Sequence, residues 1–244
     1  MRVLRGRASD PETDREWTAS MLEAAADGTS RARVWRPPRQ IAFGRRDVHE
    51  PGFEQAKRLA AAHGFRPIQR DVGGRAVVYT GQTLAFAHAV PLANDHRSIA
   101  ERYERTTAIV LSSLRRLGAA VSAGEPPAAF CPGDHSVRVT DGGKIAGLAQ
   151  RVRANSALIA GCLVVVTDDA HAIAEVTDQV YDALGVSFDP STVGSVAAAG
   201  GPDDLREVAH ALERGFIHGS LEAHKQTSRT ERLRTESASI RREW

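Results

Sequence analysis

The sequence is poor in cysteine and in long apolar runs, and each shortage removes a class of protein. Its 244 residues include two cysteines, Cys131 and Cys162, which is too few for a disulfide scaffold and fits the reduced thiols of a cytoplasm. The longest apolar stretch, residues 157–166, is about half the length that a bilayer span needs. Residues 1–7 also lack the apolar run of a signal peptide. We therefore expect a cytoplasmic protein without membrane contact.

The sequence also lacks an excess of charge of one sign. It has 32 basic and 30 acidic residues, for a formal net charge of +2, so nothing indicates a nucleic-acid partner. No HExxH or CxxC spacing is present, and we therefore predict no metal site. With 42% hydrophobic and 25% charged residues, the composition is that of an ordinary globular protein that can bury one sizeable core.

The pattern of apolar residues and turns predicts an α+β fold. Helices are expected over residues 14–26, 53–63, 99–118, 170–184 and 203–217. Strands are expected at 34–35, 40–43, 67–69, 136–140, 144–152 and 156–166, with residues 76–90 as a hairpin and 119–135 as a loop. This order favours a mixed, largely antiparallel sheet flanked by helices. We assign residues 1–220 to a single catalytic domain and 221–244 to a charged C-terminal tail.

A thiol and a lysine in neighbouring turns form the most informative pair. Cys131 begins a Cys-Pro-Gly turn, and Lys144 follows thirteen residues later on a Gly-rich bend. A thiol attacks as its thiolate, which a nearby cation favours, and an ammonium can also hold the developing oxyanion of an acyl carbonyl. The pair suggests acyl transfer through a thioester. An inert buried cysteine is the alternative, and we accept it for Cys162, which lies in an apolar strand.

Two glycine-containing segments could hold the substrate. In the first, Gly73 and Gly74 follow Arg70 and precede Ala76 and Val77. Paired glycines let a ligand approach backbone N–H groups, although an ordinary tight turn would look the same. In the second segment, small residues at Gly147 and Ala149 would let a long, thin ligand lie against a strand, and Gln150 and Arg151 offer donors for its polar head.

Four segments together resemble the lipoate–protein ligase A family. They are Gly44-Arg-Arg-Asp47, Arg70-Asp-Val-Gly-Gly-Arg-Ala-Val77, Phe130-Cys-Pro-Gly133 and Gly143-Lys-Ile-Ala-Gly-Leu-Ala-Gln-Arg151. The resemblance covers roughly residues 33–200 and implies the biotin/lipoate protein ligase catalytic fold, which is class II synthetase-like. The Cys-Pro-Gly segment is similar to the octanoyl-[glycine cleavage H protein]:protein N-octanoyltransferase branch, whose members use a cysteine acyl-enzyme.

This resemblance implies a mechanism and its partners. Cys131 would take an octanoyl or lipoyl group from an acylated carrier domain, such as the glycine cleavage H protein, as a thioester. Lys144 would position the acyl carbonyl, and the backbone near Gly73 and Gly74 would line the acyl site. A lysine on a lipoyl domain of a 2-oxoacid dehydrogenase complex would then accept the acyl group as an amide. No cofactor is required.

Two alternatives remain open at the level of sequence. The first is an ATP- and Mg²⁺-dependent lipoate–protein ligase that uses Lys144 and the Gly73-Gly74 turn, with Cys131 incidental. Arg75 stands where the ligase motif has a third glycine, and Ala160 where ligases often carry a histidine, and both departures favour the transferase. The second alternative is a non-catalytic acyl- or carrier-binding protein that kept the fold.

Overall fold

The computed structural model describes residues 1–70, 73–93 and 97–219. The predicted tail at 221–244 lies outside these residues, as do Asp71 and Val72 of the glycine motif. Within the described part of the chain, no helix is long and apolar enough to cross a membrane. The fold is built on two sheets, each covered by its own helices.

The larger sheet has seven strands and is antiparallel apart from one edge pair. Its spatial order is β1 (Arg2–Leu4), β2 (Arg31–Trp35), β6 (Leu84–Pro91), β10 (Ser156–Leu163), β9 (Lys144–Val152), β8 (Ser136–Val139) and β7 (Val121–Ala123). β1 pairs with β2 in parallel, and the other pairs are antiparallel. The predicted α+β class with a largely antiparallel sheet is therefore confirmed.

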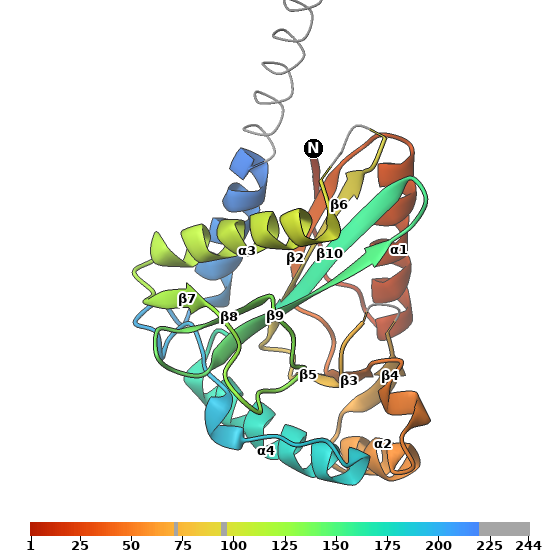
Figure 1. Cartoon of the computed structure of the whole chain (residues 1–244), viewed down its shortest axis with the longest axis vertical. Coiled ribbons are helices and arrows are strands. Elements are labelled where there is room, and N and C mark those ends of the chain that lie inside the picture. Colours follow the sequence, from red (N-terminus) through yellow and green to blue (C-terminus); the bar gives the residue numbers. More distant parts are fainter. Residues whose placement is uncertain (71–72, 94–96, 220–244) are drawn as a thin grey trace, which may run out of the picture.

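Helices cover both faces of the larger sheet (Figure 1). α1 (Pro11–Ala26) packs on the face that carries Ala85, Ala87 and Ala89 of β6. α3 (Ile99–Arg115) and a helix over residues 205–219 cover the other face. α3 begins at the predicted capping box, in which Ser98 and Glu101 each accept the backbone N–H of the other.

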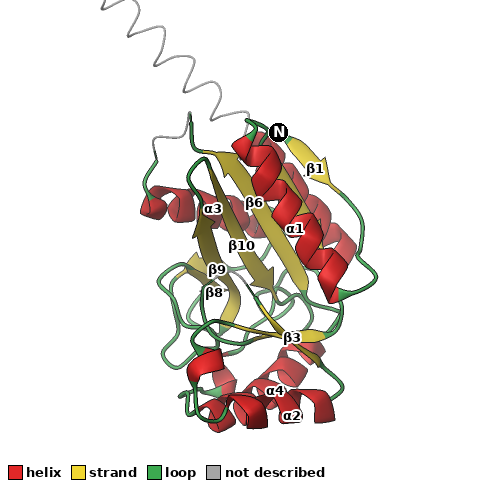
Figure 2. Cartoon of the chain, turned by 90° about the vertical axis from the view of Figure 1, so that its right-hand side faces the viewer, coloured by secondary structure: helices red, strands yellow, loops and turns green. Residues whose placement is uncertain are grey.

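The smaller sheet has the order β4 (Arg66–Gln69), β3 (Gln40–Phe43), β5 (Val77–Tyr79). α2 (Phe53–Ala62) and α4 (Thr167–Leu184) lie beneath it (Figure 2). Phe43, Phe53 and Val180 belong to the apolar core that this layer encloses. The described residues also form two short 3-10 helices, η1 (Asp47–His49) and η2 (Pro190–Thr192).

Three expectations differ from the structure. The predicted hairpin over 76–90 is wrong, because β5 pairs with β3 and β6 pairs with β2 and β10. Asp169, in the first turn of α4, accepts hydrogen bonds from Thr80 and Thr83 and holds the chain where it crosses between the sheets. The predicted loop over 119–135 contains strand β7, and the edge strand β1 was not predicted.

Candidate active site

Cys131 lies in the connection between β7 and β8, in a backbone conformation that few residues adopt. Its φ angle is +43°, in the left-handed region that is strained for a residue with a side chain. The backbone N–H of Cys131 donates to the Tyr181 hydroxyl at 2.7 Å, and that hydroxyl donates to the Ala76 carbonyl at 2.9 Å. Burial raises the pKa of Tyr181 well above its ordinary value, so the hydroxyl keeps the proton that it donates. α4 thereby holds the cysteine loop in place.

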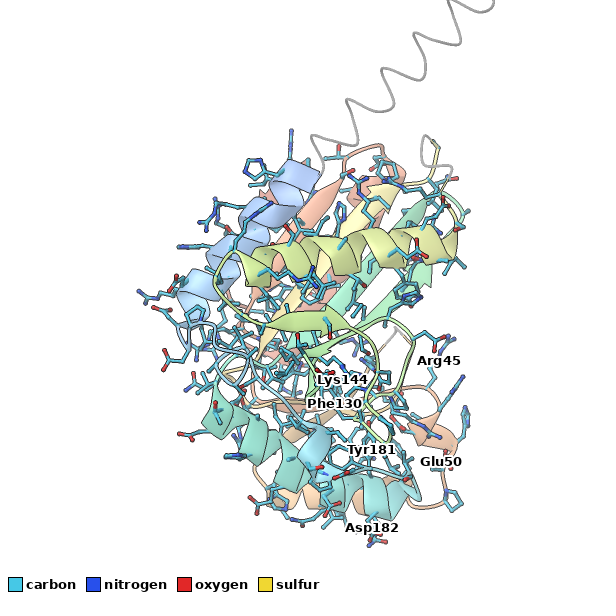
Figure 3. The ribbon with its side chains drawn as sticks, turned by 60° about the vertical axis from the view of Figure 1, so that its left-hand side comes forward. Arg45, Glu50, Phe130, Lys144, Tyr181 and Asp182 are labelled. Carbon is cyan, nitrogen blue, oxygen red and sulfur yellow. The ribbon has the colours of Figure 1, made fainter. Side chains whose placement is uncertain are left out.

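Lys144, the first residue of β9, holds the same loop from the other side. Its side chain is fully buried. Its ammonium donates to the carbonyls of Phe130 at 2.9 Å and Cys131 at 2.8 Å, and to both carboxylate oxygens of Glu125 at 3.0 and 2.9 Å. Figure 3 shows Lys144 and Phe130 close together, with Tyr181, a residue of α4, below them. An ammonium has three protons, so all of them are engaged, and the predicted contact of Lys144 with an acyl carbonyl stays a prediction.

Arg70 is the cation that contacts the sulfur. One guanidinium nitrogen donates to Cys131 Sγ at 3.2 Å and to the Arg75 carbonyl at 2.6 Å. Burial opposes the charge of Arg70, but the pKa of its guanidinium is nevertheless raised, because a negative charge on Cys131 favours the cation. A Cβ atom at Gly74 would lie 2.5 Å from both Sγ and the Arg70 nitrogen. Only glycine fits this contact, and its φ of +102° also favours glycine.

Arg75, which replaces the third glycine of the motif, connects the Gly73-Gly74 turn to η1. Its guanidinium forms ion pairs with Asp47 at 3.2 Å and Glu50 at 2.6 Å. Asp47 is fully buried, and its carboxylate also accepts the backbone N–H of Gly44 at 2.8 Å. Burial raises the pKa of Asp47, while the bonds from Gly44 and Arg75 lower it. The Gly44-Arg-Arg-Asp47 segment and the Gly73-Gly74 turn are therefore joined through Arg75.

A cavity of about 150 Å³ opens beside Cys131, bounded by α1, the larger sheet and the smaller sheet. Small residues form its sheet wall: Ala149 of β9 lies opposite Ala160 of β10, and Gly147 lies opposite Cys162. Because alternate residues of a strand share a face, Gly147 and Ala149 leave a continuous shallow strip. The strip is suited to an unbranched apolar chain.

The α1 wall of the cavity carries charge. Asp14 lines the cavity, accepts the indole N–H of Trp35 at 3.0 Å and forms an ion pair with Arg33 at 2.8 Å. The Arg33 side chain is fully buried over the Trp35 ring. Burial lowers the pKa of Arg33, opposed by the Asp14 carboxylate. Asp14 thus supports the wall through two partners on β2.

The predicted substrate-binding residues separate into two groups. Those that line the cavity are Arg70, Val77, Gly147 and Ala149. Gly74 lies against Cys131 Sγ and the Arg70 guanidinium, and Gly73 beside it faces open space. Ala76 is buried and contributes its carbonyl to Tyr181. Gln150 contacts α3, where its side-chain oxygen accepts a hydrogen bond from Arg102 at 3.3 Å.

Three features of the site were not predicted: the anchor at Tyr181, the pairing of Glu125 with Lys144 and the contact of Arg70 with sulfur. Tyr181 lies in an amphipathic helix, where an aromatic residue indicates only a core position. The predicted burial of Cys162 is confirmed, at 4% exposed, although this thiol also lines the cavity. Burial raises the pKa of Cys162. His135, four residues after Cys131, stacks on Tyr103 with ring centroids 4.1 Å apart.

Known proteins resemble the chain in sequence. It is 30% identical over 134 residues to the octanoyl-[GcvH]:protein N-octanoyltransferase of Geobacillus kaustophilus, covering 54% of this chain and 47% of that protein. It is 25% identical over 122 residues to the lipoyl-[GcvH]:protein N-lipoyltransferase of Listeria monocytogenes, covering 50% and 44%. The chain spans about half the length of the curated relatives it matches.

Solved structures resemble it in fold. A lipoate-protein ligase A bound with ATP superposes with a TM-score of 0.71 at 21% identity, covering 89% of this chain and 84% of the other. A bi-partite lipoate protein ligase from Thermoplasma acidophilum gives 0.66 at 20% identity, covering 89% and 82%. The predicted catalytic fold is therefore confirmed. The family model of the lipoyl protein ligase A/B catalytic domain matches residues 10–217, and the chain belongs to that family.

Proposed function

We propose that this protein is a protein N-octanoyl or N-lipoyl transferase that carries its acyl group on Cys131. The observation that carries the proposal is the position of Cys131 Sγ. The sulfur lies at the wall of an apolar cavity, 3.2 Å from a cation and against a glycine that leaves room for it. A thiolate held by a cation is the form that attacks acyl carbonyls.

The proposed reaction is balanced with the acylated donor and the acceptor lysine alone. The thiolate of Cys131 attacks the acyl carbonyl of an amide on the donor; the C–N bond breaks, a C–S bond forms, and the donor amine leaves with a proton. The amine of the acceptor lysine then attacks the thioester, loses a proton, and expels the thiolate. One amide is exchanged for another, so the chemistry needs neither ATP nor a metal.

The cavity supports a medium-length acyl chain as the transferred group. The strip of Gly147, Ala149 and Ala160 lies along the sheet and lines the same cavity as Cys131. Burial of each methylene contributes about 0.8 kcal/mol, so an eight-carbon chain gains several kcal/mol from the cavity. The acyl chain is then the main source of binding energy at this site.

The names of the relatives support the choice of partners. Several are called octanoyl-[GcvH]:protein N-octanoyltransferases, which favours the glycine cleavage H protein as donor. One structural neighbour is described together with its E2 lipoyl domain, which favours lipoyl domains of 2-oxoacid dehydrogenase complexes as acceptors. Such a reaction belongs in the cytoplasm, where the Cys131 thiol stays reduced.

The test mixes the protein, without ATP, with the octanoyl thioester of an acyl carrier protein and follows its intact mass. A thioester donor is used because an amide donor would leave little acyl-enzyme at equilibrium. We expect one octanoyl mass that hydroxylamine removes, absent in Cys131→Ser and present in Cys162→Ala. The wild type and Cys162→Ala should then transfer the octanoyl group from octanoylated H protein to a purified lipoyl domain, and Cys131→Ser should not.

Two other functions give different results in the same assay. A lipoate–protein ligase would show no adduct and would octanoylate the lipoyl domain only with octanoate, ATP and Mg²⁺, with Cys131→Ser fully active. The engaged ammonium of Lys144 does not separate the two functions, because both would use that residue, whereas Arg75 and Ala160, which depart from the ligase pattern, favour the transferase. A non-catalytic binding protein would turn over none of these donors.

A further inference from the structure

Two cations reach the Cys131 loop, and they contact different atoms. Lys144 contacts main-chain oxygens of the loop, and its charge is opposed by the Glu125 carboxylate at 2.9 Å. Arg70 contacts the sulfur itself. A charge that already has a counter-ion in contact contributes little to a second anion nearby, whereas a cation in direct contact with that anion contributes fully. The two residues should therefore have separate roles.

We infer that Arg70 is the catalytic residue that holds the thiolate of Cys131, while Lys144 shapes the loop that presents it. This inference rests on the proposed function, since it assigns a role within the same thioester reaction. Arg70 does not act as the base, because a guanidinium stays protonated in proteins. The thiol proton passes to solvent, and the hydrogen bond from Arg70 favours the anion that remains.

Three features of the site fix the guanidinium at the sulfur. The nitrogen that contacts Cys131 Sγ also donates to the Arg75 carbonyl at 2.6 Å, which fixes its direction. The Gly74 position excludes any side chain from the space beside them. The main chain of Arg70 is fixed as well, because its backbone N–H donates to the Phe43 carbonyl at 3.0 Å.

Arg75 is a positioning residue in this arrangement. Its side chain is held by Asp47 and Glu50, and its main-chain carbonyl receives the Arg70 hydrogen bond. The residue that departs from the ligase glycine motif is therefore the one that orients the cation on the nucleophile. A glycine there would lack both ion pairs and would leave the carbonyl less constrained.

The test compares alkylation of Cys131 by iodoacetate and by iodoacetamide in the full chain, quantified by the mass of the peptide that carries Cys131. Both reagents report thiolate, but iodoacetate is an anion, so the ratio of the two rates measures positive charge at the sulfur. The variants are Arg70→Met, Arg70→Gln and Lys144→Met. Arg66→Lys, at an exposed position of β4, is the control.

We expect Arg70→Met to slow alkylation by iodoacetamide about tenfold or more, because a charge-assisted hydrogen bond to the thiolate is lost. Alkylation by iodoacetate should slow further, so that the ratio of the iodoacetate rate to the iodoacetamide rate falls. Arg70→Gln, which keeps hydrogen-bond donors without the charge, should also lower the ratio and serves where Arg70→Met does not fold. Lys144→Met should lower thermal stability but keep the wild-type ratio, and Arg66→Lys should match the wild type.

Two outcomes would overturn the inference: wild-type rates and ratio in the folded Arg70 variants, or a fall of the ratio in Lys144→Met equal to that in Arg70→Met. Failure of the proposed function is seen separately. If the wild type forms no octanoyl adduct although its alkylation depends on Arg70, then Arg70 activates Cys131 for some other reaction.

Discussion

Replacement of Ala149 by leucine should shorten the acyl chain that the protein accepts. Ala149 lies on the cavity side of β9, opposite Ala160, and leucine adds three carbons that enter the cavity. If they displace three methylenes of an octanoyl chain, the loss is about 2.4 kcal/mol, at about 0.8 kcal/mol each. That corresponds to roughly a fiftyfold loss of octanoyl transfer, whereas a butyryl chain is too short to meet the new side chain.

The assay is competition between octanoyl and butyryl thioesters of an acyl carrier protein, read from the two acyl-enzyme masses. The ratio of octanoyl to butyryl adduct should fall in Ala149→Leu and stay unchanged in Val152→Leu, a control on the same strand whose side chain is 45% exposed. Equal losses for both chain lengths would show that the leucine disturbs the site as a whole. An unchanged ratio would show that the chain does not lie along β9.

Further expectations concern stability. Glu125→Ala should leave the Lys144 charge buried and unpaired, which costs about 3 kcal/mol and about 6–12 °C in melting temperature for a chain of this size; a shift under 1 °C would contradict the buried pair. Tyr181→Phe should lose about 1–3 kcal/mol of unfolding free energy and slow alkylation of Cys131, measured by urea unfolding and peptide mass; unchanged alkylation would mean that the hydroxyl does not set the loop. Asp10 caps α1, and the hydrogen bond from the Thr13 backbone lowers its pKa from 3.8 to about 2. Its stabilisation is therefore present above pH 3.8 and lost as the pH falls to about 2, so the melting temperatures of wild type and Asp10→Ala should converge over that range and differ above it.

The sequence predicts the structure correctly where the pattern depends only on neighbouring residues. The capping box at Ser98 and the small residues at Gly147 and Ala149 predict their structural roles from neighbours in the chain. Thr80 lies within the predicted hairpin over 76–90, where the chain instead crosses between the two sheets. A turn and a crossing between sheets share the same residues, and the choice is made by Asp169, far along the chain.

Cys131, Lys144 and Arg70, which the motifs single out, lie together in the structure, but the sequence did not predict how they contact one another. Which cation contacts the sulfur depends on Glu125, whose carboxylate engages Lys144, and on the Tyr181 hydroxyl that anchors the loop. Such contacts depend on the packing of distant elements, which composition and spacing do not record.

The long separation between Arg70 and Cys131 has a consequence for biosynthesis. The two residues lie 61 positions apart, and the loop anchor at Tyr181 comes 50 positions after the thiol. A ribosome therefore releases Cys131 well before α4 exists to hold it beside Arg70. The nascent chain therefore holds Cys131 without its loop anchor, and under the proposed function the acyl-carrying thiol is assembled only when the completed domain closes around it.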